Sequence, residues 1–116
     1  MPSTAAAPTV SSLTADQYGI NIDVTVMQCI VSLQLDDGDK TIRVSEHLVG
    51  DTTGAIILKT TQDVQAGSRL QIHNGYTQVI DGYLRLIADT IEPSSEAPVQ
   101  VNTSNNLSLN KLVRRN

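Results

Sequence analysis

The sequence predicts a small all-β barrel, and three observations support this prediction. Apolar and polar residues alternate in short runs through the middle of the chain. Turn-forming sequences separate the runs: DDGD at 36–39, GDTTG at 50–54 and DG at 81–82. The connection at 62–67 is too short for a long helix. Short alternating strands with glycines at the corners build closed antiparallel barrels, so we expect five strands in a Greek-key arrangement.

Length and composition place one domain between two arms. A chain of 116 residues, 40% of them hydrophobic, supplies one core, which Ile, Leu and Val must fill because the chain has no Phe and no Trp. Residues 1–12 are mostly small or polar, and residues 92–110 are rich in Ser, Asn, Pro and Glu. We therefore expect a flexible N-terminal arm at 1–12, the barrel at 13–91 and a flexible or partner-docking tail at 92–116.

The first strand changes its buried parity part of the way along. Its first half places Ile20, Ile22, Val24 and Val26 on one side, and its second half follows the opposite parity, with Met27, Cys29, Val31, Leu33 and Leu35. A parity change indicates a bulge or a sharp bend, which lets one barrel strand belong to two sheets. We expect both sets to be buried, including the thiol of Cys29.

Alternation also assigns the inward side chains of the next strands. On the second strand we expect Ile42, Val44 and Leu48 inside, with Thr41, Arg43, Ser45 and His47 outside. On the third and fourth strands the inward residues are Ile56, Leu58, Leu70 and Ile72.

The final hairpin can be assigned in register. Asp81-Gly82 is a strong two-residue type I′ turn, which pairs Ile80 with Tyr83, Gln78 with Arg85 and Tyr76 with Ile87. The opposite parity is more uniformly aliphatic and forms the better core face: Thr77, Val79, Leu84, Leu86 and Ala88. The first six residues therefore face outward, with Gly75 allowing a bulge before them. They form either a platform for flat ligands or ordinary cross-strand packing under a terminal arm.

Catalytic and metal chemistry lack the necessary motifs. Neither His47 nor His73 has Cys, Asp or Glu at a compact ligand spacing, and the single cysteine cannot form an internal disulfide. No nucleophile elbow or complete EF-hand loop is present. We expect a non-enzyme with no catalytic residues, no metal and no cofactor.

No apolar run approaches the roughly 18 residues of a membrane span, and the first residues lack signal-peptide character, so we expect an intracellular protein, nuclear or cytoplasmic.

Three segments carry a resemblance to a known family. These are LTADQYGINIDVTV, LVGDTTGAIIL and AGSRLQIHNGYTQVIDGYLRL, which together span roughly residues 13–89. In order and spacing they are similar to the single-domain OB-fold proteins of the SOSS-B type and their plant relatives. The resemblance implies an OB fold that binds single-stranded DNA or RNA.

The same resemblance implies a set of stacking positions that this chain fills differently. The family's stacking aromatics fall at Thr61, Tyr76, Ile80 and Ile87, of which only Tyr76 is aromatic here, while Tyr83 adds a ring nearby. Base stacking on an aromatic side chain contributes roughly 1–3 kcal/mol per base. Three missing rings therefore cost on the order of 3 kcal/mol, about a hundredfold in affinity. We expect weak or partner-assisted binding.

The acidic net charge also predicts weak binding to nucleic acid. The net charge is −4 and the isoelectric point about 4.8, whereas nucleic-acid binders gain free energy from basic residues. Four cations fall on non-core parities, Arg43, Lys59, Arg69 and Arg85, as either a basic stripe or solvated surface charges. Three more lie at the C-terminus, Lys111, Arg114 and Arg115.

Two functional hypotheses follow. The first is single-strand binding on the outer face of the barrel, through Arg43, Lys59, Thr61, Arg69, Tyr76, Gln78, Ile80, Tyr83, Arg85 and Ile87. The alternative is an OB-fold module for protein interaction or oligomerisation without strong nucleic-acid binding. For that role the apolar tail residues would dock on a protein partner or on a second copy: Leu107, Leu109, Leu112 and Val113.

Overall fold

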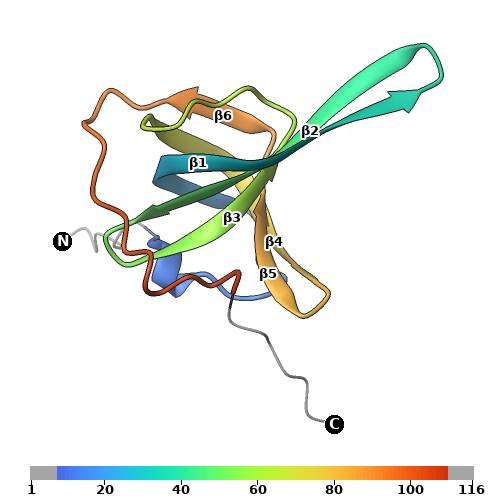
Figure 1. Cartoon of the computed structure of the whole chain (residues 1–116). Coiled ribbons are helices and arrows are strands. Elements are labelled where there is room, and N and C mark those ends of the chain that lie inside the picture. Colours follow the sequence, from blue (N-terminus) through green and yellow to red (C-terminus); the bar gives the residue numbers. More distant parts are fainter. Residues whose placement is uncertain (1–7, 110–116) are drawn as a thin grey trace, which may run out of the picture.

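Six strands form one closed sheet in the computed structural model, which describes residues 8–109 (Figure 1). The strands are β1 (Ile20–Asp37), β2 (Lys40–Asp51), β3 (Gly54–Thr60), β4 (Arg69–Ile80), β5 (Tyr83–Ile87) and β6 (Thr90–Pro93). They lie in the order β1-β2-β3-β5-β4-β6, and an additional pairing of β1 with β4 closes the barrel. Neighbouring strands are antiparallel except for β3 and β5, which are parallel. The predicted all-β barrel is confirmed.

The sixth strand continues the fifth. β4 pairs with β5 from Tyr76 to Ile80 and with β6 from Leu70 to His73, and one antiparallel register holds along both stretches. The interruption falls at residues 88–89, opposite the bulge that separates the two halves of β4. The barrel therefore has five strand positions, as predicted, with the last one broken in the middle.

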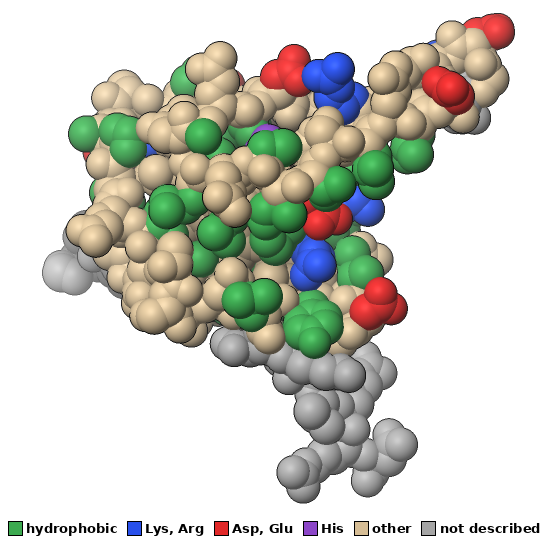
Figure 2. Space-filling view, viewed as in Figure 1, with side chains coloured by type: hydrophobic (Ala, Val, Ile, Leu, Met, Phe, Trp, Pro, Cys, Tyr) green, Lys and Arg blue, Asp and Glu red, His purple; other side chains and the backbone are tan. Residues whose placement is uncertain are grey.

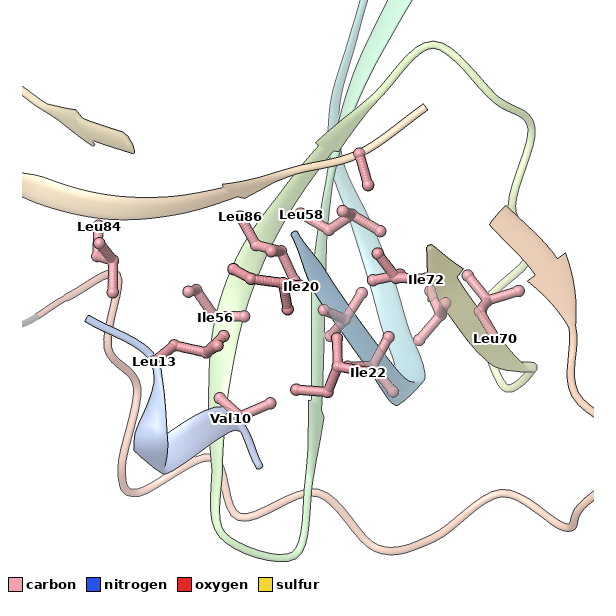
Figure 3. Packing of buried hydrophobic residues seen from close by; sticks show 14 residues of the cluster. Val10, Leu13, Ile20, Ile22, Ile56, Leu58, Leu70, Ile72, Leu84 and Leu86 are labelled. Atoms are coloured by element: carbon pink, nitrogen blue, oxygen red, sulfur yellow. The ribbon is translucent and has the colours of Figure 1, made fainter. Parts of the chain in front are cut away.

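In β3, β4 and β5 the core lies on the side of each strand that the alternation of apolar and polar residues predicts. Ile56, Leu58, Ile72 and Leu86 are fully or almost fully buried, and the first half of β1 joins them. Figure 3 shows this cluster, which fills the barrel with aliphatic side chains alone. The predicted hairpin pairing is also confirmed, with positive φ at both Asp81 and Gly82, as a type I′ turn requires.

The second half of β1 differs from its prediction. Register shifts between Val26 and Gln28 and between Cys29 and Val31 confirm the expected bulge. Beyond it, β1 leaves the barrel and pairs with β2 alone, so residues 28–44 form a projecting ribbon, here called the arm (Figure 1). Because no second sheet within residues 8–109 covers this half of β1, the expected burial of its apolar residues is wrong, and so is that of the Cys29 thiol: Met27, Cys29, Val31, Leu33 and Leu35 are exposed.

The inward side of β2 is the reverse of the predicted one. Paired residues share a face of a sheet, and the buried Ile56 and Leu58 of β3 pair with Val49 and His47. Val49, His47 and Ser45 consequently point inward. The residues that were expected inside take the outer side, where Ile42 is exposed and Val44 and Leu48 are half-buried.

Both ends of the described chain pack on the barrel. Residues 9–12, expected in a flexible arm, include the short 3₁₀ helix η1 (Val10–Ser12), and Val10 is fully buried beside Leu13 in the core (Figure 3). The N–H of Val10 donates to Asp51 Oδ2 at 3.0 Å. Residues 1–7 and 110–116 lie outside the described part, and with them Lys111, Leu112, Val113, Arg114 and Arg115.

The segment after β6 lies along the barrel as a strap, here residues 99–108. Its backbone forms two hydrogen bonds with Ala55 of β3. The Ala55 N–H donates to the carbonyl of Asn105, and the Leu107 N–H donates to the carbonyl of Ala55. Ser108 then links β3 and β5, accepting from the N–H of Ile57 and donating to the carbonyl of Leu84. A Cβ at Gly50 would clash first with the backbone carbonyl oxygen of Gly54 and would lie 2.7 Å from Val101 Cγ1, so glycine is needed there for the backbone of the GDTTG turn itself as well as for the strap. These hydrogen bonds join the strap to its own barrel.

Buried His47 predicts acid sensitivity of the fold. Its side chain is 4% exposed, neither ring nitrogen has a hydrogen-bond partner, and burial lowers the pKa of the imidazole. The unfolded chain, with a histidine pKa near 6.5, then binds the proton more readily than the folded chain. Stability contributed by neutral His47 is therefore present above about pH 6.5 and is lost as pH falls toward the lowered folded pKa.

Urea unfolding from about pH 7.5 to about pH 5 measures this loss, and His47→Leu should lose less stability than the parent over that range. Identical pH profiles for the parent and His47→Leu would contradict the assignment.

Candidate nucleic-acid interface

The strand register assembles one continuous outer face across four strands. Glu46 on β2 pairs with Lys59 on β3, Lys59 pairs with Ile87 on β5, and Ile87 pairs with Tyr76 on β4. A second row follows the same strands through Leu48, Ile57, Arg85 and Gln78. Two members of these rows, Ile57 and the predicted outward residue Ile87, are buried at 8% and 9% exposure. The Ile80–Tyr83 pair completes this surface, here called the outer face, at the Asp81-Gly82 turn. Six of the ten sequence-predicted binding residues thus lie on one hairpin, and Lys59 lies beside them.

A shallow groove of about 150 Å³ crosses the outer face. It is lined by Val44, Lys59, Thr60, Thr61, Tyr76, Gln78, Ile87 and Asp89. At its end Thr61 donates to Asp89 Oδ1 twice, from its N–H at 3.1 Å and from its hydroxyl at 2.9 Å. Thr61, the position where a stacking ring was expected from the resemblance, therefore links the end of β3 to the break between β5 and β6.

Two tyrosine rings stack at this groove. The ring centroids of Tyr18 and Tyr76 are 5.8 Å apart with an interplanar angle of 18°, and the side chains are 75% and 37% exposed. Buried Thr77 holds the loop of Tyr18 against β4: its N–H donates to the carbonyl of Gln17, and its hydroxyl accepts from the Gln17 N–H and donates to the carbonyl of Thr14. The stack is therefore positioned by hydrogen bonds between Thr77 and the backbone of the loop, which do not involve the rings.

Sequence reasoning missed Tyr18. It lies in the loop before β1, between Asp16 and Gly19, which both have positive φ, whereas Tyr76 lies on β4. No periodic pattern connects a loop residue with a distant strand. The available signal was that Tyr18 is one of only three rings in the chain.

Charges on the outer face nearly balance. Lys59 and Arg85 bring two cations, and Glu46 and Asp89 bring two carboxylates to the same strands. Arg85 Nε lies 3.8 Å from Glu46 Oε1, an ion pair too long for a hydrogen bond, and this nitrogen has no hydrogen-bond partner. Both side chains are partly exposed. The guanidinium also donates from Nη1 to the carbonyl of Leu84 at 3.4 Å, so Arg85 is held by one hydrogen bond and one long ion pair, with its Nε buried.

The other two predicted cations lie elsewhere. Arg43 is exposed on the arm opposite Gln34, on the side away from Val44. Arg69 bonds Asp23 at 3.4 Å, Glu96 at 3.0 Å and the carbonyl of Ala97 at 3.0 Å. Of the two alternatives left open by the sequence, a stripe of four cations is thus not what the fold assembles.

A larger hollow of about 550 Å³ runs along β1 and β4, at Arg69. Three carboxylates line it, Asp23, Asp51 and Glu96, and its arginine is already paired with two of them. Such a wall repels phosphate, so size alone does not make it the nucleic-acid site.

Within residues 8–109, no three His, Cys, Asp or Glu side chains converge as a metal site. In the same range no helix is long and apolar enough to cross a membrane.

Two solved structures share the fold. A hypothetical protein from Arabidopsis thaliana, known from a solution structure, superposes with a TM-score of 0.82 at 22% identity, covering 100% of this chain and 92% of its own. The second OB-fold domain of replication protein A from Methanococcus maripaludis gives 0.62 at 17% identity, covering 78% of this chain and 96% of that domain. These similarities show that the barrel is an OB fold. No curated protein matches the chain in sequence.

A family model identifies the barrel more narrowly. Residues 13–92, which hold all six strands apart from the last residue of β6, match the model described as single-stranded DNA binding protein Ssb-like, OB fold. The resemblance inferred from the three sequence segments is thereby confirmed, and the chain belongs to the Ssb-like family of OB-fold single-stranded DNA-binding proteins.

Proposed function

We propose that the outer face binds single-stranded DNA or RNA, weakly or with the help of a partner protein, as a nuclear or cytoplasmic protein. The observation that carries the proposal is the Tyr18–Tyr76 stack beside the groove. Aromatic rings that are exposed on a strand surface bind bases through their π faces without regard to sequence. Membership of the Ssb-like family supports the same role.

The proposed binding mode uses the two rows of the outer face differently. Bases stack against Tyr18 and Tyr76, and half-buried Ile80 supplies an apolar contact where another ring is absent. Ile87 is 9% exposed and contributes only the part of its side chain that lines the groove. Lys59 and Arg85 lie in neighbouring strands and reach the phosphates. The role is binding, not catalysis, and it needs no cofactor.

Weak affinity follows from the same residues. Two phosphate contacts give a salt dependence of only about −1.4 in log K against log salt, at about −0.7 per contact with a single strand. The carboxylates of Glu46 and Asp89 oppose even these contacts. Binding should therefore depend more on stacking than on charge, in keeping with the net charge of −4.

Removing either stacked ring tests the site directly. Tyr76→Ala and Tyr18→Ala should each weaken binding of a labelled single-stranded oligonucleotide by roughly 1–3 kcal/mol, about 5- to 150-fold, measured by fluorescence anisotropy. Duplex DNA and single-stranded RNA serve as competitors. Tyr18→Phe keeps the ring and is the matched control, with parental affinity expected. Parental affinity of both folded alanine variants would remove the stack from the site.

Charge at the ion pair gives an independent test. Glu46→Gln frees Arg85 and removes a carboxylate facing the phosphates, so affinity should rise about two- to fivefold. Arg85→Ala should lower affinity and flatten the salt dependence by about 0.7. Glu92→Gln is the control, because Glu92 lies on β6 beside His73 and away from the groove. Equal effects of Glu46→Gln and Glu92→Gln would show that only net charge matters.

A further inference from the structure

The arm has one apolar and one polar side. Its register pairs Leu33 with Val44 and Leu35 with Ile42, so these residues share a side with Val31. The opposite side carries Ser32, Gln34, Asp36, Thr41 and Arg43. Leu33 and Leu35 are 54% and 51% exposed, and Figure 2 shows hydrophobic side chains along the lower side of the arm. A two-stranded ribbon whose two faces are both in contact with water does not need an apolar face for its own folding.

One edge of the arm is open and unprotected. β1 pairs with β4 only as far as Thr25, so among the described residues 8–109 the β1 edge from Gln28 onward has no neighbouring strand. Its bulges fall before Val31, which leaves a regular strand from Val31 to Asp37. Proteins usually protect such edges with lysine, proline or bulges. The sequence VSLQLDD has no basic residue and no proline, whereas the β2 edge of the arm carries Lys40 and Arg43.

We propose that two copies of this chain associate by antiparallel pairing of their β1 edges, centred at Leu33. This register is self-complementary: Leu33 faces its own copy, Val31 faces Leu35, and Ser32 faces Gln34. Apolar side chains then meet apolar ones and polar side chains meet polar ones. A twofold axis relates the copies, so the assembly closes as a dimer.

Charge selects the antiparallel arrangement. Asp36 and Asp39 lie at the tip of the arm and are exposed. Parallel pairing would bring the carboxylates of the two tips together, while antiparallel pairing places the tips at opposite ends. The stretch that pairs in this register, residues 31–35, is about 17 Å long at about 3.3 Å per residue and roughly 10 Å wide. That area lies well below the roughly 800 Å² per partner of a standard interface, so we expect micromolar dissociation.

Sedimentation velocity of the full chain under reducing conditions, from about 1 to about 500 μM, tests the dimer. The parent should pass from monomer to dimer over this range. Leu33→Lys should weaken association at least about tenfold, because two like charges would face each other at the axis. Thr41→Lys adds the same charge to the polar side of the arm, on the other strand, and should leave association unchanged.

Cross-linking tests the register. With Cys29→Ser as background, Leu33→Cys should give a disulfide-linked dimer on mild oxidation, and Thr41→Cys in the same background should not. A parent that stays monomeric throughout would overturn self-pairing and leave the edge for a strand of a different protein. Equal weakening by both lysine variants, or cross-linking at Thr41, would also overturn it. Neither experiment involves nucleic acid, so the result is independent of the proposed binding function.

Discussion

The buried faces of β3 determine how the rest of the molecule is arranged. Ile56 and Leu58 are fully buried, and their partners on β2 and β5 must take the same side. This constraint turns His47 inward in spite of its polar ring and turns Val44 and Leu48 outward in spite of their hydrophobicity. It also sets the row that runs from Glu46 to Tyr76. The outer face and the buried histidine are thus two consequences of one packing requirement.

The sequence predicts local structure well where the turn chemistry is specific. Asp81-Gly82 determines the register of its hairpin, and with it six of the proposed site residues. The β1–β2 arm could not be predicted in the same way, because alternation shows that a strand has an apolar side but not whether anything covers that side. Leu33 and Ile56 occupy similar positions in alternating runs, but only Ile56 is covered by other strands of the barrel, so Ile56 is buried and Leu33 is exposed. The docking of the strap could not be predicted either, because its contacts are mostly hydrogen bonds of polar residues such as Asn105 and Ser108, which leave no apolar pattern in the sequence.

An outer face with few rings and balanced charge sets the character of this family member. Two stacked tyrosines remain, one of them contributed by the loop before β1, and each cation on the face has a carboxylate nearby. Such a surface favours loose, sequence-tolerant contacts. The arm adds apolar surface that continues to the groove through Val44. Nucleic-acid contacts and contacts between copies would therefore use adjoining parts of one sheet.

A residue-resolved titration would show whether single strands bind on the outer face. We would record ¹H–¹⁵N correlation spectra of the labelled chain while adding an unlabelled oligothymidylate of about ten nucleotides, within the usual site size of an OB fold. Binding on the outer face should shift the signals of Tyr18, Lys59, Tyr76, Gln78 and Arg85 and leave those of the Arg69 hollow and the polar side of the arm unaffected. Shifts centred at Arg69 or Arg43, or none at saturating oligonucleotide, would contradict it.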